Sequence, residues 1–236
     1  MIYIYTEKYT PRFKYIAHHI FEKILNDKVS VIRDENEARE CKEPLIVYSR
    51  TLTLDNAFNI RPHGLVFQDG IRDQDTTVTE WNDTKIFFRT GDDKYDLPFD
   101  IFSASFFLLS RYEEYYGEKD ELSRFKKESS LAYKNGFLDR PLVDEWAYML
   151  ESMLVRKLKY KPAKKGEFRM HSSVVIDNFY KYRYNSITLS IVSLIKQIKR
   201  KTTFQYRKKD LSMMKRPEEL TVEQKIGLVT CVRRSD

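Results

Sequence analysis

Charged and aromatic residues gather at two places in the middle of the chain, where they could line a polar cleft that binds a ligand. The members of this set are Arg111, Glu113, Glu114, Asp144, Glu145 and Trp146. Both groups fall in segments of helical periodicity, so an interhelical salt-bridge network beside an aromatic core explains the same pattern. His63 lies between Pro62 and Gly64. It either lines a pocket or completes a turn.

Asp177 is a candidate of another kind, because it directly follows the apolar run of residues 173–176. An acid at the end of a strand is suggestive of a functional site, but it equally fits a helix N-cap or a solvated turn. His18 and His19 are adjacent in the chain, so they face different sides of a helix and do not have the spacing of metal ligands.

The elements that would position these residues alternate between strands and helices. Residues 2–5, 29–32 and 45–48 read as strands, and Thr10-Pro11 opens a helix between the first two. Asp34 and Glu37 form a capping box for a short helix that runs to about residue 40. This order predicts an α/β fold with a mixed or largely parallel sheet.

The rest of the N-terminal part is predicted to be mainly helical. Residues 65–67 and 86–88 read as short strands, followed by helices over residues 99–116 and from Pro141 to about residue 158. Trp146 falls on the apolar stripe of the second helix and is expected to pack on the first. The basic segment 160–167 contains Pro162 and Gly166, which predicts a domain boundary near residue 160.

Charge divides the chain at about the same place. Residues 1–155 hold 21 Lys or Arg and 28 Asp or Glu, whereas residues 156–216 hold 18 and 3. Cys41 and Cys231 lie far apart, and no apolar run approaches the ~20 residues of a membrane span. With no signal-peptide pattern at Met1, we expect a soluble, cytoplasmic protein with unpaired thiols.

Five motifs carry a family resemblance: residues 62–67, 96–102, 110–115, 130–138 and 141–147. In this order they resemble the uncharacterised domain that precedes the catalytic domain in bacterial polysaccharide-deacetylase-family proteins. The resemblance covers most of residues 1–160 and continues into residues 173–178. It implies an N-terminal α/β domain over residues 1–160, followed by a partial β/α deacetylase domain over residues 161–236.

Deacetylases of this kind resemble metal-dependent hydrolases on a distorted β/α barrel. One acid activates water, while another acid and two histidines hold a zinc-like divalent metal. Asp177 matches the metal-binding acid, but Val175 stands at the position of the base, and no histidine follows His171. Only 69 residues follow Glu167, whereas a β/α barrel needs about 200.

These departures predict a non-catalytic or vestigial member of the family, with a carbohydrate-related role in binding carbohydrate or another protein chain. A metal would then bind only if another chain completes the site, which makes a deacetylase subunit the alternative. A second alternative rests on the basic residues 181–209. They could contact an anionic membrane through the stripe at residues 187–198, whereas nucleic-acid binding is disfavoured because no such module is recognisable.

Overall fold

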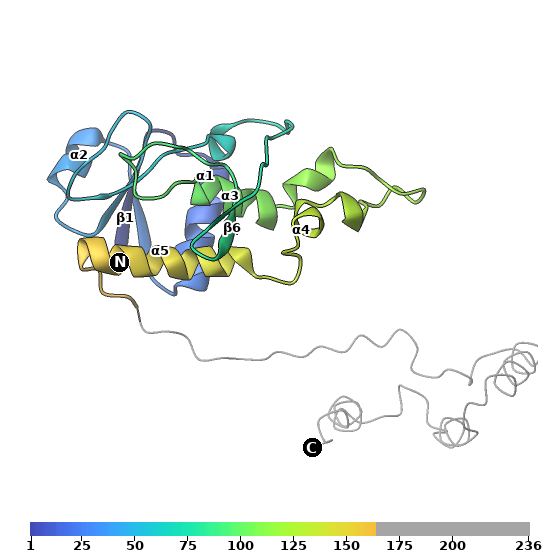
Figure 1. The fold of residues 1–236 in the computed structure, drawn as a ribbon. Coiled ribbons are helices and arrows are strands. Elements are labelled where there is room, and N and C mark those ends of the chain that lie inside the picture. The colour runs from blue at the N-terminus through green and yellow to red at the C-terminus, as the bar shows by residue number, and fades with distance from the viewer. Residues whose placement is uncertain (164–236) are drawn as a thin grey trace, which may run out of the picture. The chain divides into compact units, whose positions relative to one another are not determined.

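The computed structural model describes residues 1–163, which form an α/β fold around a parallel sheet of four strands (Figure 1). The apolar run at residues 173–176, Asp177 and the stripe at residues 187–198 lie outside the described residues. The predicted boundary near residue 160 stays a prediction. Within residues 1–163, no helix is long and apolar enough to cross a membrane.

The predicted order of the first five elements is confirmed. Strand β1 (Ile2–Thr6) leads into α1 (Pro11–His18), β2 (Val29–Ile32) leads into α2 (Glu35–Glu40), and β3 (Leu45–Tyr48) follows. All strand pairs in the sheet are parallel, and the order is β2-β1-β3-β4. The chain therefore reverses its direction of winding between β1 and β3, and β2 forms one edge of the sheet.

The two predicted N-caps start the helices. Thr10 accepts a hydrogen bond from the Phe13 amide at 3.1 Å, and Asp34 accepts one from the Glu37 amide at 2.9 Å. Helix α1 continues into a turn of π-helix, η1 (His19–Ile24), where the Leu25 amide reaches the Ile20 carbonyl at 3.0 Å.

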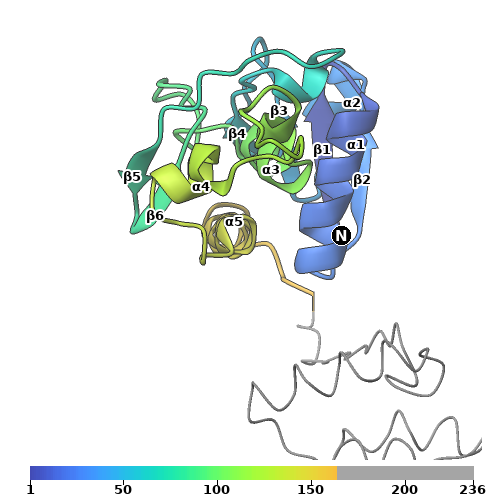
Figure 2. The same cartoon turned by 90° about the vertical axis from the view of Figure 1, so that its right-hand side faces the viewer.

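Both faces of the sheet are covered. On one face, Ile4, Ile46 and Tyr48 belong to the large core formed with α1, α3 (Ile101–Leu109) and α5 (Leu142–Leu158). Figure 2 looks along α5 and shows α1 and α3 beside it. Alternate side chains of the same strands point to the other face, where a smaller core forms against α2 and the loop after β3.

Two predicted strands are corrected. Residues 65–67 form a 3-10 helix, η2 (Leu65–Phe67), because the preceding Gly64 takes a left-handed φ of 118° and turns the chain away from the sheet. The strand predicted at residues 86–88 is β6 (Thr84–Ile86), which ends before Phe88, at a φ of 57°. It pairs antiparallel with β5 (Thr79–Trp81).

The helix predicted over residues 99–116 is shorter than expected. Asp100 caps α3, which ends at Leu109, and Arg111 takes a φ of 51° before the short 3-10 helix η3 (Tyr112–Tyr115). A left-handed residue cannot continue an α-helix, so the helical spacing of residues 112–116 misled the prediction. Four further short elements were not predicted, namely β4 (Phe58–Ile60), β5 (Thr79–Trp81), η4 (Lys127–Ser129) and α4 (Leu131–Lys134).

Trp146 lies in the core, as its place on the apolar stripe of α5 predicts. Its ring lies 5.4 Å from that of Phe99 and 5.8 Å from that of Phe87, measured between centroids. Its indole Nε1–H donates to the Lys85 carbonyl at 3.0 Å. Phe87 directly follows β6, and Phe99 lies just before α3 and is not part of it. Trp146 therefore packs α5 against both ends of the segment that connects β6 to α3.

Trp146→Ala should lower the free energy of unfolding by about 3–5 kcal/mol, because it removes a fully buried ring and leaves a carbonyl without its donor. Urea unfolding followed by circular dichroism measures the loss. Val155→Ala is the matched control, since Val155 lies on the same helix and is 38% exposed. Equal midpoints for the two variants would contradict the buried position of Trp146.

Candidate functional site

The structure does not bring the two predicted charged groups together. Arg111 and Glu114 pair with each other, and Glu113 accepts a hydrogen bond from the Leu131 amide at 2.7 Å. Burial raises the pKa of Glu113 above its ordinary value, and this hydrogen bond only partly offsets the effect. Glu113 therefore fastens α4 to the turn after α3.

The second group serves the start of α5. Glu145 pairs with Arg140 and accepts a hydrogen bond from the Thr84 hydroxyl at 3.2 Å, while Asp144 is exposed in the first turn. Within residues 1–163, no ion pair links Arg111, Glu113 or Glu114 to Asp144 or Glu145. The predicted interhelical network is therefore not formed among these residues, and the polar cleft stays a prediction.

No cluster of three or more His, Cys, Asp or Glu side chains suited to a metal ion occurs among the described residues. Asp177 lies outside this range. Its expected histidine partners would follow it in the chain, where the sequence has none. The interpretation of Asp177 as the metal-binding acid of an incomplete zinc-like site therefore stays a prediction.

A buried carboxylate, Asp100, organises the carboxyl edge of the parallel sheet. Its Oδ2 accepts hydrogen bonds from the Tyr48 hydroxyl and the His63 amide, both at 2.7 Å. Its Oδ1 accepts from the Phe102 and Ser103 amides, both at 3.0 Å, which caps α3. The side chain is fully buried, and four hydrogen bonds offset the cost of burying it.

His63 is held in this network by its backbone as well as by its ring. The ring stacks on Phe88, with 4.1 Å between centroids and 10° between planes. Its carbonyl accepts a hydrogen bond from Arg50, and a side chain at Gly64 would come within 2.8 Å of the same guanidinium. The guanidinium could move away from such a side chain, but Gly64 has a φ of 118°, which residues other than glycine adopt only with strain.

The imidazole of His63 is kept neutral by its surroundings. Burial lowers its pKa below the ordinary 6.5, and the nearby Arg50 lowers it further, while Asp100 acts in the opposite direction. Its Nδ1 is buried and has no hydrogen-bond partner.

Glu7 closes the sheet edge at the point where winding reverses, between β1 and β3. Its Oε1 accepts hydrogen bonds from the Arg50 amide at 3.0 Å, the Thr51 amide at 3.2 Å and the Thr51 hydroxyl at 2.8 Å, and from the Ser49 hydroxyl. Partial burial raises the pKa of Glu7, but these hydrogen bonds outweigh it and hold the pKa below the ordinary value. Open parallel sheets commonly bind ligands at this point, and here the protein's own carboxylate occupies it.

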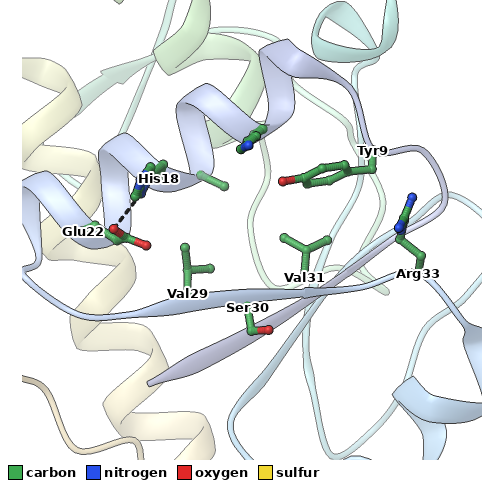
Figure 3. A pocket seen from close by; sticks show the side chains of 9 residues that line it. Tyr9, His18, Glu22, Val29, Ser30, Val31 and Arg33 are labelled. Atoms are coloured by element: carbon green, nitrogen blue, oxygen red, sulfur yellow. Dashed lines mark ion pairs between the residues drawn. The ribbon is translucent and has the colours of Figure 1, made fainter.

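An open groove lies elsewhere, between α1 and the edge strand β2 (Figure 3). Its volume is about 340 Å³, and Figure 3 shows Val29 and Val31 pointing into it from β2. At one end His18 Nδ1 lies 2.8 Å from a Glu22 carboxylate oxygen. The rest of its lining is Tyr9, Lys14, Ala17, Ser30 and Arg33. It is the kind of concave surface that receives a ligand or a peptide.

Three of these features were not predicted as site residues: Asp100, Glu7 and the groove. A signal for Asp100 was present, since an acid two residues after Pro98 and just before an apolar helical run is an N-cap pattern. Glu7 and the groove arise from segments that are distant in the sequence, and no local pattern reveals them.

Comparison with known proteins places this fold in a family. The model of a family of unknown function, DUF7033, matches residues 2–159. The chain belongs to the DUF7033 family. The matched range ends one residue after α5 and includes every described helix and strand. No curated protein and no solved structure matches the chain.

The neutral His63 predicts a dependence of stability on pH. Because its folded pKa lies below the ordinary 6.5, protonation favours the unfolded chain, and the contribution to stability that is present above about pH 6.5 falls as the pH is lowered. His63→Phe keeps a ring to stack on Phe88 but cannot be protonated. Urea unfolding between about pH 7.5 and 5.5 should show a smaller loss of stability for this variant than for the native protein. Equal losses would contradict a neutral, desolvated His63.

Proposed function

We propose that this DUF7033 protein is a non-catalytic relative of polysaccharide deacetylases, with a carbohydrate-related role, and that residues 1–163 serve as its binding domain. The observation that carries the proposal is the state of the two carboxylates at the carboxyl edge of the sheet. Asp100 and Glu7 each accept four hydrogen bonds from the chain itself.

The buried carboxylate of Asp100, with both oxygens bonded, is poorly suited to chemistry, whereas the four hydrogen bonds to the exposed Glu7 all fall on Oε1. A general base must have a lone pair directed at the proton it removes, and a metal-binding carboxylate must direct its oxygens at the ion. All four donors to Asp100 come from β3, the turn at His63 and the first turn of α3. Breaking any of them would leave a buried polar group without its partner, at a cost of about 1–3 kcal/mol.

The motifs behind the deacetylase resemblance fit the same interpretation. Residues 62–67 contain His63 and residues 96–102 contain Asp100, and the two motifs meet in the hydrogen bond between the His63 amide and Asp100. Their residues build and hold the domain. A role in binding carbohydrate or a partner chain agrees with a rigid scaffold that leaves an open groove on another side.

The proposal predicts that the purified protein releases no acetate from acetylated chito- or xylo-oligosaccharides when zinc or another divalent metal is added. The reason is that Val175 replaces the base and no histidine follows Asp177. Enzymatic detection of acetate measures the outcome, with heat-treated protein as the blank. Release above the blank that is lost in Asp177→Ala would contradict the proposal and favour a deacetylase subunit.

A further inference from the structure

The outer edge of β2 carries backbone groups that face away from the sheet. The Ile2 amide donates to the Lys28 carbonyl at 2.9 Å, and Ile2 is in register with Val29. In a parallel ladder the bonded residues of a strand alternate, so Lys28, Ser30 and Ile32 turn their backbone groups toward β1. The amide and carbonyl groups of Val29 and Val31 therefore point outward. No other strand among residues 1–163 pairs with β2.

The groove of Figure 3 lies directly beside this edge. Val29 and Val31 are half-buried, and their side chains point into the groove on the face of the sheet that α1 covers. A strand added to β2 would place every second side chain on this same face. Those side chains would enter the groove between β2 and α1, and the apolar floor of Val29, Val31 and Ala17 suits an aliphatic group.

The positive charges beside β2 determine which kind of partner strand could pair with this edge. Lys14 and Arg33 line the groove, Lys28 is exposed at the start of the strand, and the acid in the lining, Glu22, is already paired with His18. Positive charges at an edge discourage pairing with basic or neutral strands and with unrelated sheets. They favour a segment that carries acids.

We propose that the edge of β2 is a docking site for an extended acidic segment of a partner protein, which adds to the sheet as a strand. Outward backbone groups supply the hydrogen bonds, the groove receives an aliphatic side chain, and Lys14 and Arg33 pair with acids that flank it. This docking site gives the proposed binding domain a protein partner with an extended acidic segment. The docking role does not depend on the carbohydrate part of the proposed function.

The experiment uses the full chain and a fluorescein-labelled peptide of about six residues, the usual length of a strand, in which Glu alternates with Val or Ile. Fluorescence anisotropy should show binding that weakens as salt rises, and no binding of the peptide with Lys in place of Glu. Lys14→Glu with Arg33→Glu should weaken binding by roughly tenfold or more. Lys94→Glu, a change of the same charge at an exposed loop residue outside the groove, should leave affinity unchanged.

Two further measurements test the pairing itself. Val31→Pro removes an outward amide, which an edge strand tolerates, and it should abolish binding. Hydrogen exchange on the native protein should slow at the Val29 and Val31 amides when peptide is added, and this result stands even if the proline variant unfolds. No binding up to millimolar peptide, or binding without protection of these amides, overturns the proposal. The proposal is also overturned if oligogalacturonate, an acidic oligosaccharide, binds through Lys14 and Arg33 while the peptide does not bind.

Discussion

The hydrogen bonds of the buried carboxylate of Asp100 hold three parts of the fold in one place. They connect Tyr48 at the end of β3, the turn at His63 after β4, and the first turn of α3. Tyr48 in turn stacks on Phe13 of α1, with 5.3 Å between ring centroids and 9° between planes. The pKa of the Tyr48 hydroxyl is raised well above its ordinary value, chiefly by burial and also by Asp100, so it stays protonated and donates. A single carboxylate thus joins the sheet to the helices that cover its larger core.

In this arrangement the loops at the carboxyl edge of the sheet are hydrogen-bonded to one another. Ligand sites in open parallel sheets form where loops after neighbouring strands part, and here those loops are fastened by Asp100, by Arg50 and by Glu7. Interaction surfaces are then to be sought at the remaining open features. The edge of β2 is one of them, because the backbone groups of Val29 and Val31 point outward there and no further strand among residues 1–163 pairs with them.

Much of the fold could be predicted from local patterns. Thr10-Pro11 and Asp34 with Glu37 marked helix starts, and short runs rich in apolar residues marked β1, β2 and β3. The errors occurred where a single positive φ changes the direction of the chain. Gly64 has such a φ just before η2, Phe88 just after β6, and Arg111 just after α3. Helical spacing around Arg111 gave no sign of this, because spacing reports side chains and not φ.

The candidate site was less predictable for a related reason. The charged residues grouped by the sequence have separate partners, since Glu113 binds the Leu131 amide and Glu145 binds Arg140. The residues that do meet, Tyr48, His63 and Asp100, are separated by up to 52 positions. Their contact depends on strand order, which periodicity does not specify. The stacking of His63 on Phe88 likewise follows from the tertiary fold.

A double-mutant cycle between Tyr48 and Asp100 tests most directly whether the carboxylate is committed to the fold. Unfolding free energies would be measured for Asp100→Asn, Tyr48→Phe and the double variant. We expect Asp100→Asn to cost about 2–6 kcal/mol, because its NH2 group would face two of the four donors and leave them without an acceptor, at about 1–3 kcal/mol each. The cycle should give a coupling of about 1 kcal/mol or more between the two residues. A stable Asp100→Asn variant with no coupling to Tyr48 would show that the carboxylate is not needed for stability, and would make Asp100 a candidate catalytic group.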